Sequence, residues 1–168
     1  MAKQIDDLNF SANLHLGKIE IRHNSFDKAL FYLNIAININ PEDTDIQKTS
    51  GICFYNLNKF NNCIELLLKV FQKNPEDTES VFYLAYSFYN LSRNEDSLKF
   101  FYKLMETKEY EIEALTMIAN IHKKMKMYTK SIDEYEKVIA SKSLKNDALM
   151  EIYYQLADCY VNSKCFSR

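Results

Sequence analysis

The chain has 168 residues, of which 47% are hydrophobic and 26% charged, with a formal net charge of -2. This hydrophobic content is too high for a disordered chain, and the near-neutral charge excludes long-range steering onto nucleic acid or an anionic membrane. Only two Gly and two Pro occur, too few for many β-hairpins, so we expect a helical fold throughout.

The first amphipathic helix pair is predicted within residues 10–43, after an N-terminal extension, residues 1–9. Apolar residues three and four apart mark a helix up to a break at His23-Asn24, and a second helix ends before Pro41. Asn24 stands where the chain must leave a helix. Such a site often needs a positive φ, which Asn tolerates better than most residues.

The second unit, residues 44–77, repeats the first at a spacing of 34 residues. The segment from Asn40 to Thr44 recurs from Asn74 to Thr78, and Gly17, Asn24 and Phe26 recur as Gly51, Asn58 and Phe60. Independent features in one register indicate an internal repeat of helix pairs. Thr44 and Thr78 stand near helix starts, where their hydroxyls are expected to cap orphan N–H groups.

The later units, residues 78–111 and 112–149, keep the small and apolar positions of this register. Gly17 and Gly51 are followed by Ala85 and Ala119, Ala29 is followed by Cys63, Ser97 and Ser131, and Leu33 is followed by Leu67, Phe101 and Tyr135. Small residues at one level, such as Gly17 against Ala29, let two helices approach closely. A large residue there costs about 1–3 kcal/mol.

The period then slips by four residues in a longer loop at 141–146. A partial unit, residues 150–168, follows with Ala157 at the small level and Phe166 at the level of Phe26. The second helix of this unit is absent from the sequence, so Tyr153 and Tyr160 are expected to lack a packing partner.

This pattern resembles the tetratricopeptide repeat. The resemblance rests on Leu16-Gly17, Ala29, Leu33, Ala36 and Pro41 in the first unit and on Gly51, Phe54, Leu67 and Pro75 in the second. It implies an all-α fold, a right-handed superhelical solenoid of antiparallel helix pairs over residues 10–168. Another helical-pair solenoid of similar period is the alternative architecture.

The resemblance also implies that the first helices of the units form a concave groove that holds a peptide or helix of a partner protein. The residues expected in this groove are Lys18, Arg22, Lys48, Ile52, Tyr55, Asn56, Phe82, Tyr86, Tyr89, Asn90, Asn120, Lys123, Lys124 and Tyr154. Phe82, Tyr86 and Tyr89 form one helical stripe of aromatic side chains, which suits a binding site. In the alternative interpretation the aromatics pack within the solenoid, the asparagines cap helix ends and the lysines form a solvated face.

One ligand class is rejected by the residue types. Tetratricopeptide co-chaperones hold the acidic C-terminus of a chaperone with Lys, Asn and Arg side chains. The matching positions here are Leu14, Lys18, Thr49, Glu79 and Tyr83. Only one of them is basic, and Glu79 would repel a carboxylate.

No catalytic, cofactor or metal site is predicted. The sequence has no Gly-rich phosphate loop, and His122 falls where an aromatic core residue is expected. The four cysteines, Cys53, Cys63, Cys159 and Cys165, form no Cys-x-x-Cys pair and no metal-ligand spacing with a histidine. Without an apolar signal core or a bilayer-length apolar run, we expect a cytoplasmic protein that does not insert into membranes.

We therefore expect a non-enzymatic adaptor for another protein. A structural or oligomerisation segment of a larger assembly, self-associating through the open C-terminal helix, is one alternative. A regulatory domain of a longer enzyme is another.

Overall fold

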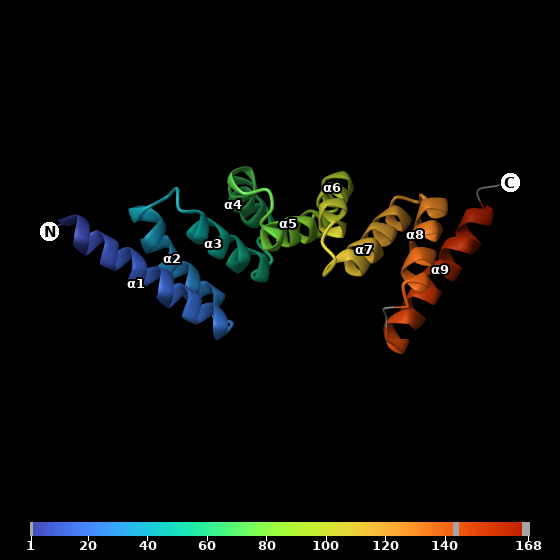
Figure 1. Ribbon diagram of the computed structural model, residues 1–168, viewed down its shortest axis with the longest axis horizontal. Coiled ribbons are helices and arrows are strands. Elements are labelled where there is room, and N and C mark those ends of the chain that lie inside the picture. The colour runs from blue at the N-terminus through green and yellow to red at the C-terminus, as the bar shows by residue number, and fades with distance from the viewer. Residues whose placement is uncertain (1, 143–144, 166–168) are drawn as a thin grey trace. The chain divides into compact units, whose positions relative to one another are not determined.

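The computed structural model describes residues 2–142 and 145–165, and within these ranges the chain forms nine α-helices and no strand (Figure 1). The helices are α1 (Ala2–Arg22), α2 (Phe26–Ile39), α3 (Thr44–Asn56), α4 (Phe60–Lys73), α5 (Thr78–Asn90), α6 (Asn94–Met105), α7 (Glu111–Lys124), α8 (Tyr128–Ala140) and α9 (Asn146–Cys165). The predicted all-α class is thereby confirmed. Phe166, assigned a repeat position from the sequence, lies outside the described residues.

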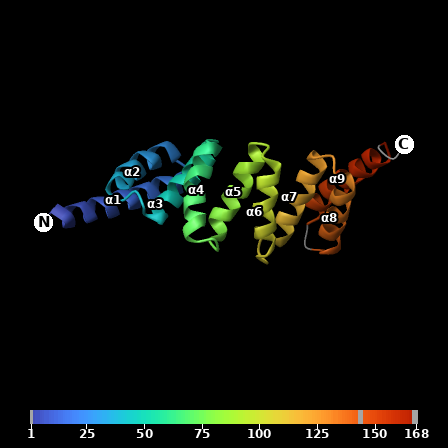
Figure 2. The same cartoon turned by 90° about the horizontal axis from the view of Figure 1, so that it is seen from above.

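The contacts divide the chain into two units, Met1–Ser92 and Arg93–Arg168. In the first unit, α1 packs on α2, α3 packs on α4, and α2 and α4 each also contact the helix that follows them (Figure 1). In the second unit, α7 packs on both α6 and α8, and α8 packs on α9, as the view from above also shows (Figure 2). Helices joined by such short turns run antiparallel.

The turns between paired helices depend on single residues with positive φ. Asn24 and Asn58 both have φ 58°, which confirms the prediction, and Ser92 (57°) and Lys126 (61°) continue the same 34-residue register. At the end of α3, Asn58 N–H donates to the Tyr55 carbonyl at 2.9 Å and Lys59 N–H donates to the Phe54 carbonyl at 2.8 Å. These two bonds form a Schellman motif, which satisfies carbonyls that the helix leaves unpaired.

The prediction that Thr44 and Thr78 cap helices is wrong. The N-cap of α3 is Asp43, whose carboxylate accepts a hydrogen bond from Ile46 N–H at 3.0 Å. Thr44 and Thr78 are the first residues of α3 and α5, and the Thr78 hydroxyl donates back to the Glu76 carbonyl. A carboxylate one position earlier is the better placed acceptor for the N–H groups of the first turn.

Two predicted boundaries fall inside helices. Residues 2–9, expected as an extension, lie in α1, which has 21 residues where α3 has 13. Helix α9 begins at Asn146, and Leu149 N–H already donates to the Lys145 carbonyl at 2.9 Å, so the boundary between residues 149 and 150 lies within its first turns. Helix α9 therefore begins at the last residue of the loop that the sequence predicts at 141–146.

Small residues on the first helices face large residues on the second helices. A Cβ added to Gly51 would lie 2.7 Å from Leu67 Cγ, and one added to Gly17 would lie 2.8 Å from Leu33 Cγ and 3.5 Å from the Ala29 carbonyl oxygen. The predicted close approach at Gly17 therefore exists, and its main partner is the Leu33 side chain.

The second unit follows the same rule. Ala119 on α7 and Tyr135 on α8 are both fully buried in one core cluster. Ser131 of α8 donates to the Ala119 carbonyl at 2.9 Å, and its hydroxyl lies 3.4 Å from the Cys159 sulfur of α9. The small residue Ser131 therefore contacts both helices that pack on α8, namely α7 and α9.

Candidate functional site: the first-helix face of α3 and α5

The predicted stripe lies on one face of α5. Phe82, Tyr86 and Tyr89 are all half-buried, so each ring packs on the protein and keeps part of its surface accessible. The following residue, Asn90, is exposed and ends the helix. This face therefore combines apolar ring surface with an amide group.

Aromatic rings connect α5 with α3. Tyr55 of α3 lies edge to face on Tyr83, with ring centroids 5.0 Å apart, and Phe82 contacts both Tyr83 at 5.4 Å and Tyr86 at 4.7 Å. Such pairs prefer offset or edge-to-face geometry, which fixes the rings relative to each other. We call Tyr55, Phe82, Tyr83, Tyr86 and Tyr89 the aromatic face.

Tyr83 was not among the residues predicted to line the groove. The sequence placed it only at a position of the carboxylate-binding set. Its ring, however, is the contact that the structure shows between Tyr55 and the α5 stripe. Sequence reasoning missed Tyr83 because the spacing within α5 does not reveal which ring of α3 packs against this helix.

Lys48 is paired with two carboxylates next to this face. Its Nζ lies 2.7 Å from Asp77 Oδ1 and 2.8 Å from Glu79 Oε2. Burial alone would lower the pKa of Lys48, but the hydrogen bonds to Asp77 and Glu79 outweigh burial and raise the pKa. Burial would likewise raise the pKa of Asp77, but hydrogen bonds from Lys48 and Ser80 lower it. The local cluster of one cation and two anions has a net negative charge.

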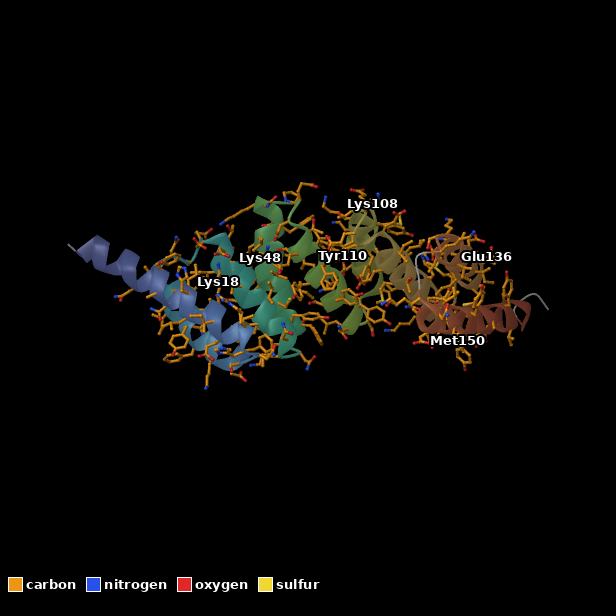
Figure 3. All side chains as sticks on the ribbon, turned by 60° about the horizontal axis from the view of Figure 1, so that its bottom comes forward. Lys18, Lys48, Lys108, Tyr110, Glu136 and Met150 are labelled. Atoms are coloured by element: carbon orange, nitrogen blue, oxygen red, sulfur yellow. The ribbon has the colours of Figure 1, made fainter. Side chains whose placement is uncertain are left out.

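Lys18 makes a similar ion pair one repeat earlier, on α1. Its Nζ lies 2.6 Å from Asp45 Oδ2, so α1 and α3 are linked as α3 and α5 are linked by Lys48. Lys18 and Lys48 are both labelled in Figure 3. Arg22, also predicted for the groove, is exposed near the end of α1, and Ile52 is half-buried on α3.

The predicted asparagines bond to their own helices. Asn56 Nδ2 donates to the Ile52 carbonyl and Asn90 Nδ2 donates to the Tyr86 carbonyl, each at 2.8 Å. These bonds fix the orientation of each amide while its residue stays exposed. Each amide oxygen can accept a hydrogen bond from a ligand.

Four predicted groove residues lie in the second unit. Asn120 accepts a hydrogen bond from the Tyr135 hydroxyl at 2.5 Å, and Lys123 Nζ lies 2.5 Å from both Asp158 Oδ2 and Gln155 Oε1. Lys124 and Tyr154 are exposed, Tyr154 at 71%. Asn120 and Lys123 therefore already have polar partners within this unit.

His122 is a core residue, as the sequence predicted. It is 4% exposed, and its Nδ1 lies 2.8 Å from Glu134 Oε2 of α8. No sequence pattern indicates this pair, because Glu134 is one of several acidic residues expected on a helix surface. The pair of His122 and Glu134 connects α7 with α8 inside the second unit and contributes to the packing of these two helices.

Other kinds of site have little support in the described part of the chain. No group of three or more His, Cys, Asp or Glu side chains there could hold a metal ion, and no helix there is long and apolar enough to cross a bilayer. Cys53, Cys63 and Cys159 are free thiols in the core. Burial raises the pKa of Cys53 to about 12 and that of Cys63 to about 11, which disfavours the reactive thiolate.

Comparison with known proteins places the chain in a fold group. Residues 112–143 match the family model of the tetratricopeptide repeat. Comparison with curated proteins gives no match. Among solved structures, the chain is similar to a crystal structure of MamA protein, with a TM-score of 0.80, 15% identity and coverage of 93% of this chain and 83% of that one.

Two further MamA structures give the same result. The chain from residue 41 to the end of the Desulfovibrio magneticus RS-1 protein has a TM-score of 0.76 at 14% identity, covering 95% of this chain and 92% of that one. The MSR-1 protein has a TM-score of 0.72 at 21% identity, covering 78% and 75%. At these identities the likeness concerns the fold. The chain therefore has a tetratricopeptide-like fold of helix pairs, and the one repeat matched by sequence spans α7 and α8.

Proposed function

We propose that this protein is a non-enzymatic interaction scaffold whose aromatic face binds a peptide or helical segment of a partner protein. The observation that carries the proposal is the connected set of half-buried rings on α3 and α5. Rings that are already packed against one another lose little conformational entropy when a ligand covers them, and they bury a large area.

The charges beside the aromatic face specify the kind of segment. Lys48 is neutralised by Asp77 and Glu79, which leaves one negative charge next to the rings. A segment with apolar anchor residues and a flanking Lys or Arg matches this surface better than an acidic peptide does. Contact of a partner with Asn120, Lys123, Lys124 and Tyr154, which lie in the second unit, stays a separate prediction from the sequence.

Affinity capture with matched variants tests the proposal. The bait is the wild-type chain, the double variant Tyr86→Ala/Tyr89→Ala, or the control Glu65→Ala/Lys69→Ala, which changes only exposed residues of α4. We expect the same partner with the wild type and the control, and loss of that partner with the tyrosine variant. Circular dichroism of all three baits verifies that each is folded. Equal capture by a folded tyrosine variant would refute binding at the aromatic face.

A cytoplasmic location is part of the same proposal. Fractionation of cells that produce the tagged chain tests it, with partner capture repeated in the fraction that contains the protein.

A further inference from the structure

Glu79 stands at one end of the aromatic face, in the first turn of α5. Tyr83 follows it at a spacing of four residues and Tyr86 at a spacing of seven, so the carboxylate and the two rings lie on one line of the helix. Burial agrees with this placement, because Ser80 and Leu84, which lie off this line, are fully buried. An apolar segment bound on the aromatic face therefore meets a carboxylate at its end.

The two carboxylates that hold Lys48 differ in how firmly they are fixed. The Asp77 side chain is 17% exposed, and it also accepts a hydrogen bond from the buried Ser80 hydroxyl. The Glu79 side chain is 53% exposed, and its Oε2 lies 2.8 Å from the Lys48 ammonium. A largely exposed ion pair contributes little to stability. Glu79 can therefore turn toward a ligand while Lys48 stays paired with Asp77.

The surplus negative charge belongs to the aromatic face and is not a property of the repeat. One repeat earlier, Asp43 and Asp45 stand at the positions of Asp77 and Glu79. There Asp43 caps the start of α3, and Asp45 pairs with Lys18 at 2.6 Å. One cation thus meets one carboxylate in the first repeat, whereas one cation meets two carboxylates beside the rings.

We propose that Glu79 selects ligand segments that carry a Lys or Arg beside their apolar anchor residues, and that it does so by exchanging Lys48 for the ligand's cation. The Lys48 ammonium, which this carboxylate holds in the free protein, shows the ligand chemistry that the position accepts. An acidic residue at the same place would face Glu79 and lose affinity through like-charge repulsion. This inference rests on the proposed binding function of the aromatic face.

The geometry of α5 sets the spacing between the cation and the anchor in a segment that runs along this helix. With a rise of about 1.5 Å per residue, Glu79 lies about 6 Å from Tyr83 and about 10 Å from Tyr86 along the axis. An extended segment covers about 3.3 Å per residue, so its cation is expected about two or three residues from the anchor. A helical segment needs about four to seven residues for the same distance.

Selection from a random peptide library tests the inference. Displayed peptides of about twelve residues, long enough for either spacing, are selected against the wild type, Glu79→Lys and the control Glu65→Lys, which reverses an exposed charge on α4. We expect the wild type and the control to enrich Lys or Arg at the stated spacing from aromatic or aliphatic anchors. Glu79→Lys changes the local charge from one negative to one positive, so it should keep the anchors and enrich Asp or Glu instead.

Titration of one enriched peptide measures the exchange. The peptide selected by the wild type, and a copy in which Glu replaces the cation, are titrated into each protein, with circular dichroism to verify folding. The copy should bind the wild type at least about tenfold more weakly, and the order should reverse on Glu79→Lys. Lys48→Met removes the competing cation of the chain itself, so the basic peptide should bind about threefold or more tightly to it. A merely structural role of Glu79 predicts neither the reversal nor the gain.

Two results would overturn the inference. One is enrichment of the same peptides by the wild type and Glu79→Lys, and the other is a basic peptide that gains no affinity from Lys48→Met. The variant Tyr86→Ala/Tyr89→Ala separates this failure from failure of the proposed function. Loss of the selected peptides on that variant supports binding at the aromatic face, whichever residue selects the charge. Peptides that bind the folded variant as they bind the wild type refute the aromatic face itself, and a library without any enriched sequence refutes both proposals.

Discussion

Gly51 lies against Leu67 so closely that a Cβ added to the glycine would be 2.7 Å from Leu67 Cγ. Leu67 is fully buried on α4 and has little room to move. Helix propensity alone predicts that Gly51→Ala stabilises the protein by about 1 kcal/mol. Overpacking costs about 1–3 kcal/mol, so we expect a net loss of stability of about 1 kcal/mol in urea unfolding followed by circular dichroism.

The sign of this effect depends on the leucine. In a Leu67→Ala background the obstructing atoms are gone, and Gly51→Ala should then stabilise the protein relative to Leu67→Ala alone. A Gly51→Ala substitution that stabilises both backgrounds would contradict the close contact.

Lys126 has φ 61° at the turn between α7 and α8, the position that Asn24 and Asn58 occupy in earlier repeats. A non-glycine residue in this conformation costs about 1–2 kcal/mol. We therefore expect Lys126→Gly to raise the free energy of unfolding by about 0.5–1 kcal/mol. The control Lys124→Gly, inside the last turn of α7, should lower it by a similar amount. Equal effects of the two substitutions would show that the turn conformation is not responsible.

The paired Lys48 predicts a pH-dependent contribution to stability. The pKa of Asp77 is lowered from 3.8, because hydrogen bonds from Lys48 and Ser80 outweigh its burial, so its contribution is present above pH 3.8 and is lost as pH falls through the folded-state pKa. The pKa of Lys48 is raised from 10.5, so its contribution is present below pH 10.5 and is lost as pH rises through the folded-state pKa.

The free energies of unfolding of the wild type and of Lys48→Met, measured from below pH 3.8 to above pH 10.5, give the contribution of this ion pair to stability. We expect a difference of about 1 kcal/mol at neutral pH that decreases at both extremes. Lys18→Met, which breaks the more exposed pair with Asp45, should have a smaller effect. A difference between wild type and Lys48→Met that does not change with pH would argue against the ion pair.

The buried thiols should resist alkylation. With pKa values of about 12 for Cys53 and about 11 for Cys63, the thiolate fractions at pH 8 are about one in 10⁴ and one in 10³. Iodoacetamide followed by peptide mapping should leave both cysteines unmodified in the folded protein and modify both in denaturant. Mapping separates these cysteines from Cys165. Rapid labelling of the folded chain would show that α3 and α4 open readily.

The sequence was sufficient for the fold because the decisive features are local. Asn24 and Asn58 mark their turns by residue type, whereas the equivalent Ser92 and Lys126 carry no such signal and follow only from the register. The caps were misassigned because Asp43 and Thr44 are both good cap residues, and only the helix start decides between them.

The candidate site was only partly predictable, because its contacts join different helices. The spacing within α5 predicts that Phe82 and Tyr86 share a face, but the contact of Tyr83 with Tyr55 requires the packing of α3 beside α5. Asp45, the partner of Lys18, and Asp77, one partner of Lys48, lie 27 and 29 residues away in the sequence, and no local pattern indicates them.

The affinity of the captured partner segment for the purified chain tests the central claim most directly. Isothermal titration should give micromolar binding to the wild type and to Glu65→Ala/Lys69→Ala. For a folded Tyr86→Ala/Tyr89→Ala variant we expect a loss of at least about tenfold, which corresponds to about 1.4 kcal/mol. Equal affinity for all three proteins would contradict the claim that the rings of α3 and α5 form the binding surface.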